Sequence, residues 1–151
     1  MPAASATLLA VVLMLISGAT LALQPPTNAV LARAVGSPVN AALASFIVGA
    51  VALLIASALL GQRPDMAAVR GLPWWAWLGG LYGAVLVAGM AYAAPRIGVA
   101  SAATLVIAGQ MLLALVLDHY GLLRLEARPA TLTKIAGVAL VFAGAWLVRR
   151  G

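Results

Sequence analysis

The sequence contains no cysteine, a single histidine and only three acidic residues. Without cysteine the chain can form no disulfide, thiolate metal site or cysteine nucleophile, and His119 alone is a poor basis for a transition-metal site. The sequence also shows no paired carboxylates, nucleophile motif or metal-ligating cluster of the kind that enzymes use. We therefore expect no enzymatic activity, no metal and no cofactor.

Charged residues are scarce and apolar residues are abundant. Of the 151 residues, 65% are hydrophobic and 8% are charged, which is too apolar for a soluble domain that covers itself with polar surface. The formal net charge is +6, but the basic residues stand singly or in pairs at the ends of apolar runs. This pattern is typical of interfacial anchoring and not of a phosphate-binding stripe. We predict an integral membrane protein that contacts the lipid bilayer and no nucleic acid.

Five apolar segments have the roughly 20-residue length that a bilayer crossing requires. They predict an all-α polytopic membrane protein, with one five-helix transmembrane domain over residues 1–151. The predicted spans cover residues 4–23, 40–60, 74–94, 99–117 and 132–148. The first span lacks the positively charged start of a signal peptide, so we expect it to be retained. Trp74, Trp75 and Trp77 open the third span as an aromatic belt at the water boundary.

The end of the first span carries most of its polar residues on one side. At helical spacing five of them fall within an arc of about 100°; they are Ser17, Thr20, Gln24, Thr27 and Asn28. Pro25 and Pro26 cannot donate backbone hydrogen bonds, which favours a kink or a break. The span either continues as one helix to Val35 or ends near the prolines, with a short interfacial helix after it. Broken helices at membrane depth usually lie inside protein or line a wet cavity. We therefore interpret this side as one wall of a substrate pathway. The alternative is hydrogen bonding between helices.

Further candidates lie in the third and fourth spans. Gln110 is strongly polar and mid-membrane, and it either joins the pathway or hydrogen-bonds a neighbouring helix. Tyr82 either stacks on a planar organic substrate or packs with its hydroxyl group toward the boundary. Asp118 and His119 are adjacent and could relay protons, but they come at the end of their span, where water is near. That position favours a capping or interfacial role.

Glycines suggest where helices pack closely. Gly79 and Gly83 form a pair of small residues at one-turn spacing, and Gly137 and Gly144 recur seven residues apart on the fifth span. Small residues let helix backbones approach one another. Both pairs are therefore candidate packing seams.

The basic residues show almost no preference for one side of the membrane. Five crossings place five of them on the side of the N-terminus and four on the other. The first group is Arg63, Arg70, Arg124, Arg128 and Lys134, and the second is Arg33, Arg96, Arg149 and Arg150. Because the bias of short loops sets orientation, this small excess predicts dual topology, unless the ends of the spans are misassigned. Two copies of opposite orientation would pair antiparallel, with the pseudo-two-fold axis by which many transporters alternate access.

Several motifs resemble those of a known family. They are residues 24–28, 31–38, 73–80, 94–98, 109–110 and 118–121, and together they resemble the YdcZ family of small bacterial inner-membrane proteins in the drug/metabolite transporter superfamily. More distantly, residues 95–98 and 137–144 resemble the last two helices of small multidrug resistance exporters and EamA-type carriers. The resemblance implies a five-helix, multi-pass exporter in the bacterial inner membrane, working as an antiparallel homodimer or as a heterodimer with a paralogue. It also favours the fifth span as the dimer contact.

One feature departs from the small multidrug resistance pattern. Those exporters place an ionised glutamate in their first helix, where protons and cationic drugs compete for it. Here the first span contains no acid. Proton coupling at that position and a preference for cations therefore do not carry over to this chain.

Together these features predict a secondary transporter that exports a small metabolite or drug-like molecule by alternating access as an antiparallel dimer. The predicted substrate-binding residues are Gln24, Asn28, Thr20, Ser17, Thr27, Gln110 and Tyr82. Two alternatives stay open. A dual-topology ion channel would need the same polar side within a continuous wetted pore, and a scaffold subunit would need it only for assembly.

Overall fold

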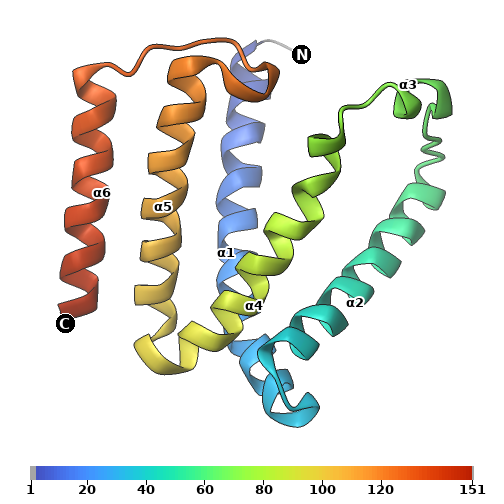
Figure 1. Ribbon diagram of the computed structural model, residues 1–151, viewed down its shortest axis with the longest axis horizontal. Coiled ribbons are helices and arrows are strands. Elements are labelled where there is room, and N and C mark those ends of the chain that lie inside the picture. The colour runs from blue at the N-terminus through green and yellow to red at the C-terminus, as the bar shows by residue number, and fades with distance from the viewer. Residues whose placement is uncertain (1–2, 151) are drawn as a thin grey trace. The chain divides into compact units, whose positions relative to one another are not determined.

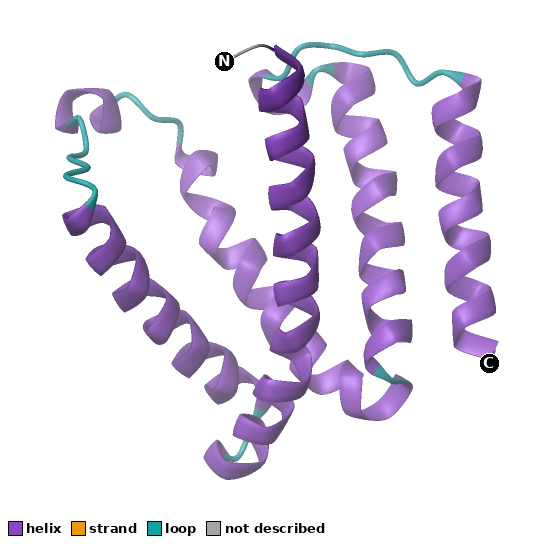
Figure 2. Ribbon diagram, turned by 180° about the vertical axis from the view of Figure 1, so that it is seen from behind, coloured by secondary structure: helices purple, strands orange, loops and turns teal. Residues whose placement is uncertain are grey.

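The computed structural model describes residues 3–150, which form helices joined by loops (Figures 1 and 2). The long helices are α1 (Ala3–Val35), α2 (Pro38–Leu59), α4 (Gly79–Ile97), α5 (Val99–Tyr120) and α6 (Leu132–Arg150). The short ones are α3 (Met66–Arg70) and two 3₁₀ helices, η1 (Trp74–Leu78) and η2 (Leu122–Arg124). The predicted all-α fold class is confirmed.

Five stretches of the described residues are long and apolar enough to cross a membrane. They are Thr7–Val35, Pro38–Leu59, Trp74–Ile97, Val99–Tyr120 and Leu132–Arg150, which confirms the five predicted spans. The chain divides into two compact units, residues 1–92 and 93–151, with the boundary inside α4. We describe each unit by itself, and the single five-helix domain stays a prediction.

Helix α1 runs without a break through Pro25 and Pro26. The alternative in which a separate interfacial helix follows the prolines is therefore wrong. Past the prolines, the Thr27 hydroxyl group donates to the carbonyl groups of Leu23 and Gln24, at 3.0 and 2.8 Å. At 1.5 Å per residue α1 is about 50 Å long. It therefore exceeds a hydrocarbon core of about 30 Å and has to tilt or protrude.

A tight turn joins α1 to α2, as the sequence predicts. Gly36 has a φ angle of 85°, a conformation that glycine adopts without steric cost. The Ser37 hydroxyl group then caps α2 by accepting from the backbone N–H of Asn40 at 3.0 Å. The Asn40 side chain reaches back to donate to the Val35 carbonyl group at 2.9 Å. These bonds tie the two helix ends together and fix how α2 leaves the turn.

The third span extends further at its C-terminal end than the sequence predicts. Helix α4 continues through Pro95 to Ile97, so the predicted connection over residues 95–98 shrinks to Gly98 alone. Proline removes one backbone donor, but its φ angle is compatible with a helix. Gly98, with a φ angle of 82°, makes the reversal into α5. At its other end the span begins as η1, which holds the three tryptophans.

The loop between α2 and η1 contains an unpredicted short helix, α3. Asp65 precedes it, and its carboxylate oxygen accepts from the backbone N–H groups of Ala67 and Ala68 at 2.9 and 3.2 Å. A carboxylate at a helix start satisfies donors that have no partner within the helix. The acid in this loop therefore has a local structural role.

Small residues form the contacts inside each unit. In the first unit, α1 packs against α2, and in the second, α5 packs against α6 (Figure 1). The buried apolar residues of α2, α5 and α6 are alanines, including Ala41, Ala102, Ala108 and Ala145. Large apolar side chains point outward, as lipid-facing residues do. Helix backbones thus approach closely where alanines meet.

Candidate functional site

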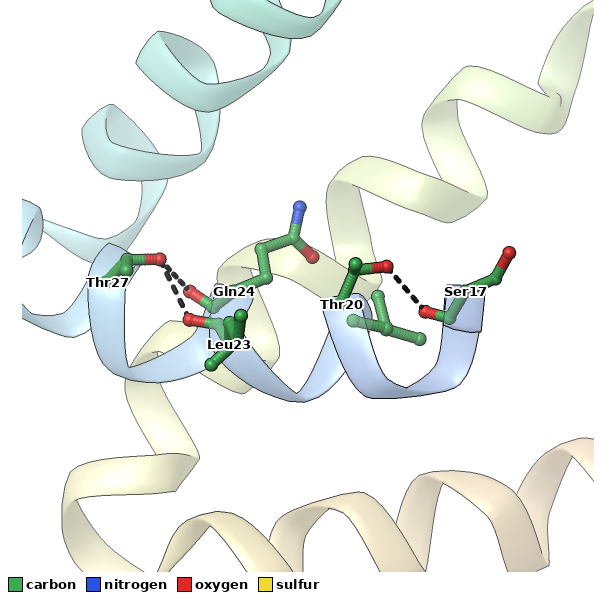
Figure 3. Close-up of a pocket in the computed structure, with 6 residues that line it drawn as sticks. Ser17, Thr20, Leu23, Gln24 and Thr27 are labelled. Carbon is green, nitrogen blue, oxygen red and sulfur yellow. Dashed lines mark hydrogen bonds between the residues drawn. The ribbon is translucent and has the colours of Figure 1, made fainter. Parts of the chain in front are cut away.

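The polar side of α1 lines a shallow groove of about 430 Å³. Four of the predicted residues line it, Ser17, Thr20, Gln24 and Thr27, together with two leucines. Figure 3 shows the Ser17, Thr20 and Gln24 side chains on one side of the helix. The periodicity of the sequence therefore placed these four residues correctly, while their role in binding stays a prediction.

The hydroxyl groups on this side use their hydrogens within α1. Ser17 donates to the Leu13 carbonyl group at 2.8 Å, and Thr20 donates to the Ser17 carbonyl group at 2.9 Å. Thr27 donates to two carbonyl groups of the same helix. A hydroxyl group has one donor and two acceptor sites, so these three side chains are left with oxygen lone pairs to offer. They present acceptors to the groove.

Gln24 differs from these hydroxyl groups. Its side chain is half-buried, and among the residues that the structure describes no group hydrogen-bonds its amide. It lines the groove on α1 and also a second hollow, of about 280 Å³, between α1 and α2. On the α2 side this hollow is lined by Ser45, Phe46, Gly49, Ala50 and Leu53. Gln24 is therefore the amide that both spaces share.

Asn28 turns away from the groove and into the α1–α2 contact, where it is 4% exposed. Its side-chain oxygen accepts a short hydrogen bond from the Ser45 hydroxyl group. Its amide nitrogen, Nδ2, is buried and finds no partner within residues 3–150. Leaving a buried donor unpaired costs about 1–3 kcal/mol, and such groups are rare enough to require an explanation.

Ser45 is a residue that the sequence reasoning missed. It lies one turn past Ala41 and Ala42, which are the buried residues of α2. A serine in a mostly apolar span is common, because its hydroxyl group can bond its own helix. The signal that could have found it is the turn at residues 36–37. A tight turn brings the start of α2 alongside the end of α1, where Asn28 lies.

Neither hollow is lined by a charged residue. A charged ligand would therefore lose its hydration there without gaining a counter-charge, which is costly in a membrane interior. This agrees with the absence of an acid from the first span. The site suits uncharged polar groups.

Two other predicted residues do not line these hollows. Tyr82 is on α4, where it is 61% exposed, and it lines neither of the two spaces beside Gln24. Gln110 is exposed on α5, in the second unit. Their contributions to binding stay predictions.

Asp118 and His119 hold the loop between α5 and α6. The Asp118 carbonyl group accepts from the backbone N–H of Arg128 at 2.7 Å. The His119 Nδ1 atom accepts from the backbone N–H of Ala130 at 3.1 Å. The His119 side chain thus has a structural contact within the loop, whereas the Asp118 contact uses only its backbone. The capping or interfacial role of the pair stays a prediction.

Within the described residues, five helices of bilayer-spanning length define a multi-pass membrane protein. The chain belongs to the YdcZ family, since the family model described as "Putative inner membrane exporter, YdcZ" matches residues 9–147. The resemblance noted from the motifs is thus confirmed, as is a multi-pass location in the inner membrane. The family description is that of a transporter and not of an enzyme. No curated protein and no solved structure is significantly similar to the chain.

Proposed function

We propose that the protein is a secondary transporter that exports a small metabolite or drug-like molecule by alternating access. The observation that supports this most is the unpartnered Gln24 amide on the polar side of α1, between two uncharged hollows. A structural role alone would leave the amide bonded to a neighbouring helix, as is usual for polar residues within spans. A carrier instead needs polar groups that are free to exchange water for substrate.

We further propose that the working unit is an antiparallel dimer, either of two copies or with a paralogue. Within the first unit, no residue of α1 from Thr7 to Gln24 is buried, although this part of the helix carries the polar side chains of Ser17, Thr20 and Gln24. Polar groups facing lipid are unfavourable. A second α1 laid across the shallow groove would cover them and turn the groove into a central cavity, to which Gln110 and Tyr82 would add. The near-equal basic residues on the two sides favour the opposite orientations that this requires.

Transport is tested with purified protein in proteoliposomes. A thermal-shift screen of uncharged metabolites and drugs first identifies compounds that stabilise the folded protein by mass action. Counterflow of a radiolabelled compound from this set is then measured. We expect Gln24→Leu to lower the rate at least tenfold, because it removes the free amide. The matched change Gln62→Leu, in the exposed loop after α2, should leave the rate unchanged. Full counterflow by Gln24→Leu would contradict the proposal.

Orientation and mechanism have separate tests. C-terminal fusions to reporters that are active on only one side of the membrane should give signal from both compartments. Signal from a single compartment would rule out the antiparallel homodimer and favour pairing with a paralogue of opposite orientation. Single-channel conductance in planar bilayers would instead favour the ion-channel alternative, because carriers move far fewer molecules per second.

A further inference from the structure

The hollow between α1 and α2 has one polar end and one apolar wall. Gln24 and Ser45 form the polar end, and Phe46, Ala50 and Leu53 form the wall. The two helices meet near their turn and diverge from it (Figures 1 and 2). The residues of the hollow begin one turn beyond the buried Ala41 and Ala42. The hollow therefore lies where the helices begin to part.

The aromatic part of the wall is supported from behind. A Cβ atom at Gly83 on α4 would lie 3.1 Å from the Cζ atom of Phe46. The phenyl ring thus lies close to the α4 backbone, and an alanine at position 83 would press on it. This contact limits the movement of the ring and gives the hollow a defined side.

The hydrogen bond between Ser45 and Asn28 fixes the orientation of the Asn28 amide at the polar end of the hollow. Because the Ser45 hydroxyl group donates to the Asn28 oxygen, the remaining end of that amide is the donor Nδ2, which is buried and unpaired. Gln24 lies four residues earlier on α1, a spacing at which side chains on a helix meet. When the Gln24 oxygen accepts from Nδ2, the Gln24 amide nitrogen is left to donate into the hollow. In that arrangement Ser45, through Asn28, would set which end of the Gln24 amide faces the hollow.

We propose that this hollow is a binding subsite for an uncharged organic molecule with a hydrogen-bond acceptor, such as a carbonyl group, on an apolar body. The acceptor would bond the Gln24 amide and the apolar part would lie against Phe46, Ala50 and Leu53. Binding would fix Gln24 in the orientation that satisfies Asn28. The inference rests on the proposed transport function and names the substrate class for it. Asn28 acts as a positioning residue, because it lines neither hollow and would reach the ligand only through Gln24. Ser45 lines the hollow and also orients the Asn28 amide.

The chain contains no cysteine, so a single introduced thiol reports on the hollow alone. Ala50→Cys places the thiol on the wall, and Val51→Cys places a control on the opposite side of α2 by helical spacing. Both variants are reconstituted in lipid nanodiscs and treated with a charged methanethiosulfonate reagent, which reacts with thiols in water. We expect Ala50→Cys to react at least tenfold faster than Val51→Cys. Equal rates would overturn the subsite, because the hollow would then be closed to water.

The ligand class is tested by protection of Ala50→Cys with four probes that share one ring. Benzamide carries an uncharged acceptor, toluene carries none, benzoate is an anion and benzylammonium is a cation. We expect benzamide to slow the reaction severalfold more than each of the other three. The excess protection by benzamide over toluene should vanish when Ser45→Ala or Asn28→Leu is added, because the Gln24 amide then loses its fixed orientation. Ser45→Ala removes fewer atoms and serves if Asn28→Leu does not fold.

Three results would overturn the inference. They are protection by toluene equal to that by benzamide, stronger protection by a charged probe, and an unchanged excess for benzamide in Ser45→Ala. Counterflow with the compounds from the thermal-shift screen, measured on the same variants, separates this inference from the transport proposal. Protection without counterflow would contradict the transporter and leave the subsite standing. Counterflow without protection would support the transporter and overturn the subsite.

Discussion

The two helix pairs that pack within the units bury different chemistry. Where α1 meets α2, the contact contains Asn28 with one hydrogen bond and one unpaired donor. The buried residues of α5 and α6 are alanines and one serine, Ser101. Small residues alone are enough to pack helices in a membrane, and α5–α6 shows that this chain can do so. The costly amide in α1–α2 is therefore better explained by function, because proteins break local rules mainly at functional sites.

The largest expected effect comes from placing a charge where the amide lies. We expect Asn28→Asp to lower the free energy of unfolding by about 3 kcal/mol, because the buried carboxylate would need a basic partner. No basic residue lines either of the two hollows beside Gln24. The control Asn28→Leu should stay within about 1 kcal/mol of the parent, since it removes the unpaired amide donor and the Ser45 hydroxyl group can bond a carbonyl group of its own helix instead. Reversible unfolding in sodium dodecyl sulfate measures both. An Asn28→Asp variant as stable as the parent would mean that this contact is already hydrated.

Overpacking the second pair should have the next largest effect. Ala145 on α6 is 3% exposed, and Ala145→Leu should cost about 2 kcal/mol because the added atoms force the neighbouring helix aside. Ala143→Leu, at an exposed position of the same helix, is the matched control and should change stability little. Melting temperature in detergent checks both variants. Equal stability of the two would show that α5–α6 is not closely packed, and the contrast with α1–α2 would fail.

The hydrogen bond across α1–α2 can be tested separately. Ser45→Ala removes the donor to Asn28 and should cost about 1 kcal/mol, because the amide oxygen then loses its partner. Ser57→Ala on the same helix removes only a 3.4 Å bond to the Gln62 carbonyl group and should cost less. The same unfolding assay compares them. A larger loss for Ser57→Ala would contradict the importance of the contact at Asn28.

The smallest effect concerns the support behind Phe46. Alanine stabilises a helix over glycine by up to about 1 kcal/mol, and Gly89→Ala should approach this gain because nothing lies within 4 Å of its new Cβ atom. Gly83→Ala should gain less, since its Cβ atom presses on the Phe46 ring. Melting temperatures of the two variants show the difference. Equal gains would mean that the ring is free to move.

Part of the site could be predicted from residue spacing alone. Ser17, Thr20, Gln24 and Thr27 share a groove because a 3.6-residue period places them on one side of α1. The same spacing also grouped Asn28 with them, but packing against α2 covers that side chain. Of the glycine pair predicted as a packing seam, Gly83 lies against Phe46, whereas nothing lies within 4 Å of a Cβ atom at Gly79. The predicted turn at residues 36–37 was the one signal for Ser45, and Phe46 had none, since which residues of one span face another depends on how the turn sets the helices.

The sequence by itself determined the membrane class, the five spans and the polar side of the first helix, because hydropathy and helical period act within a segment. Only the tertiary structure decided that α1 continues through its two prolines and that α4 continues through Pro95. It also decided that Asn28 bonds Ser45 while Gln24 remains free between two hollows. The physical reason is that helix continuation past a proline and the pairing of polar groups depend on neighbours far apart in the chain. Such contacts leave no periodic trace in the residues themselves.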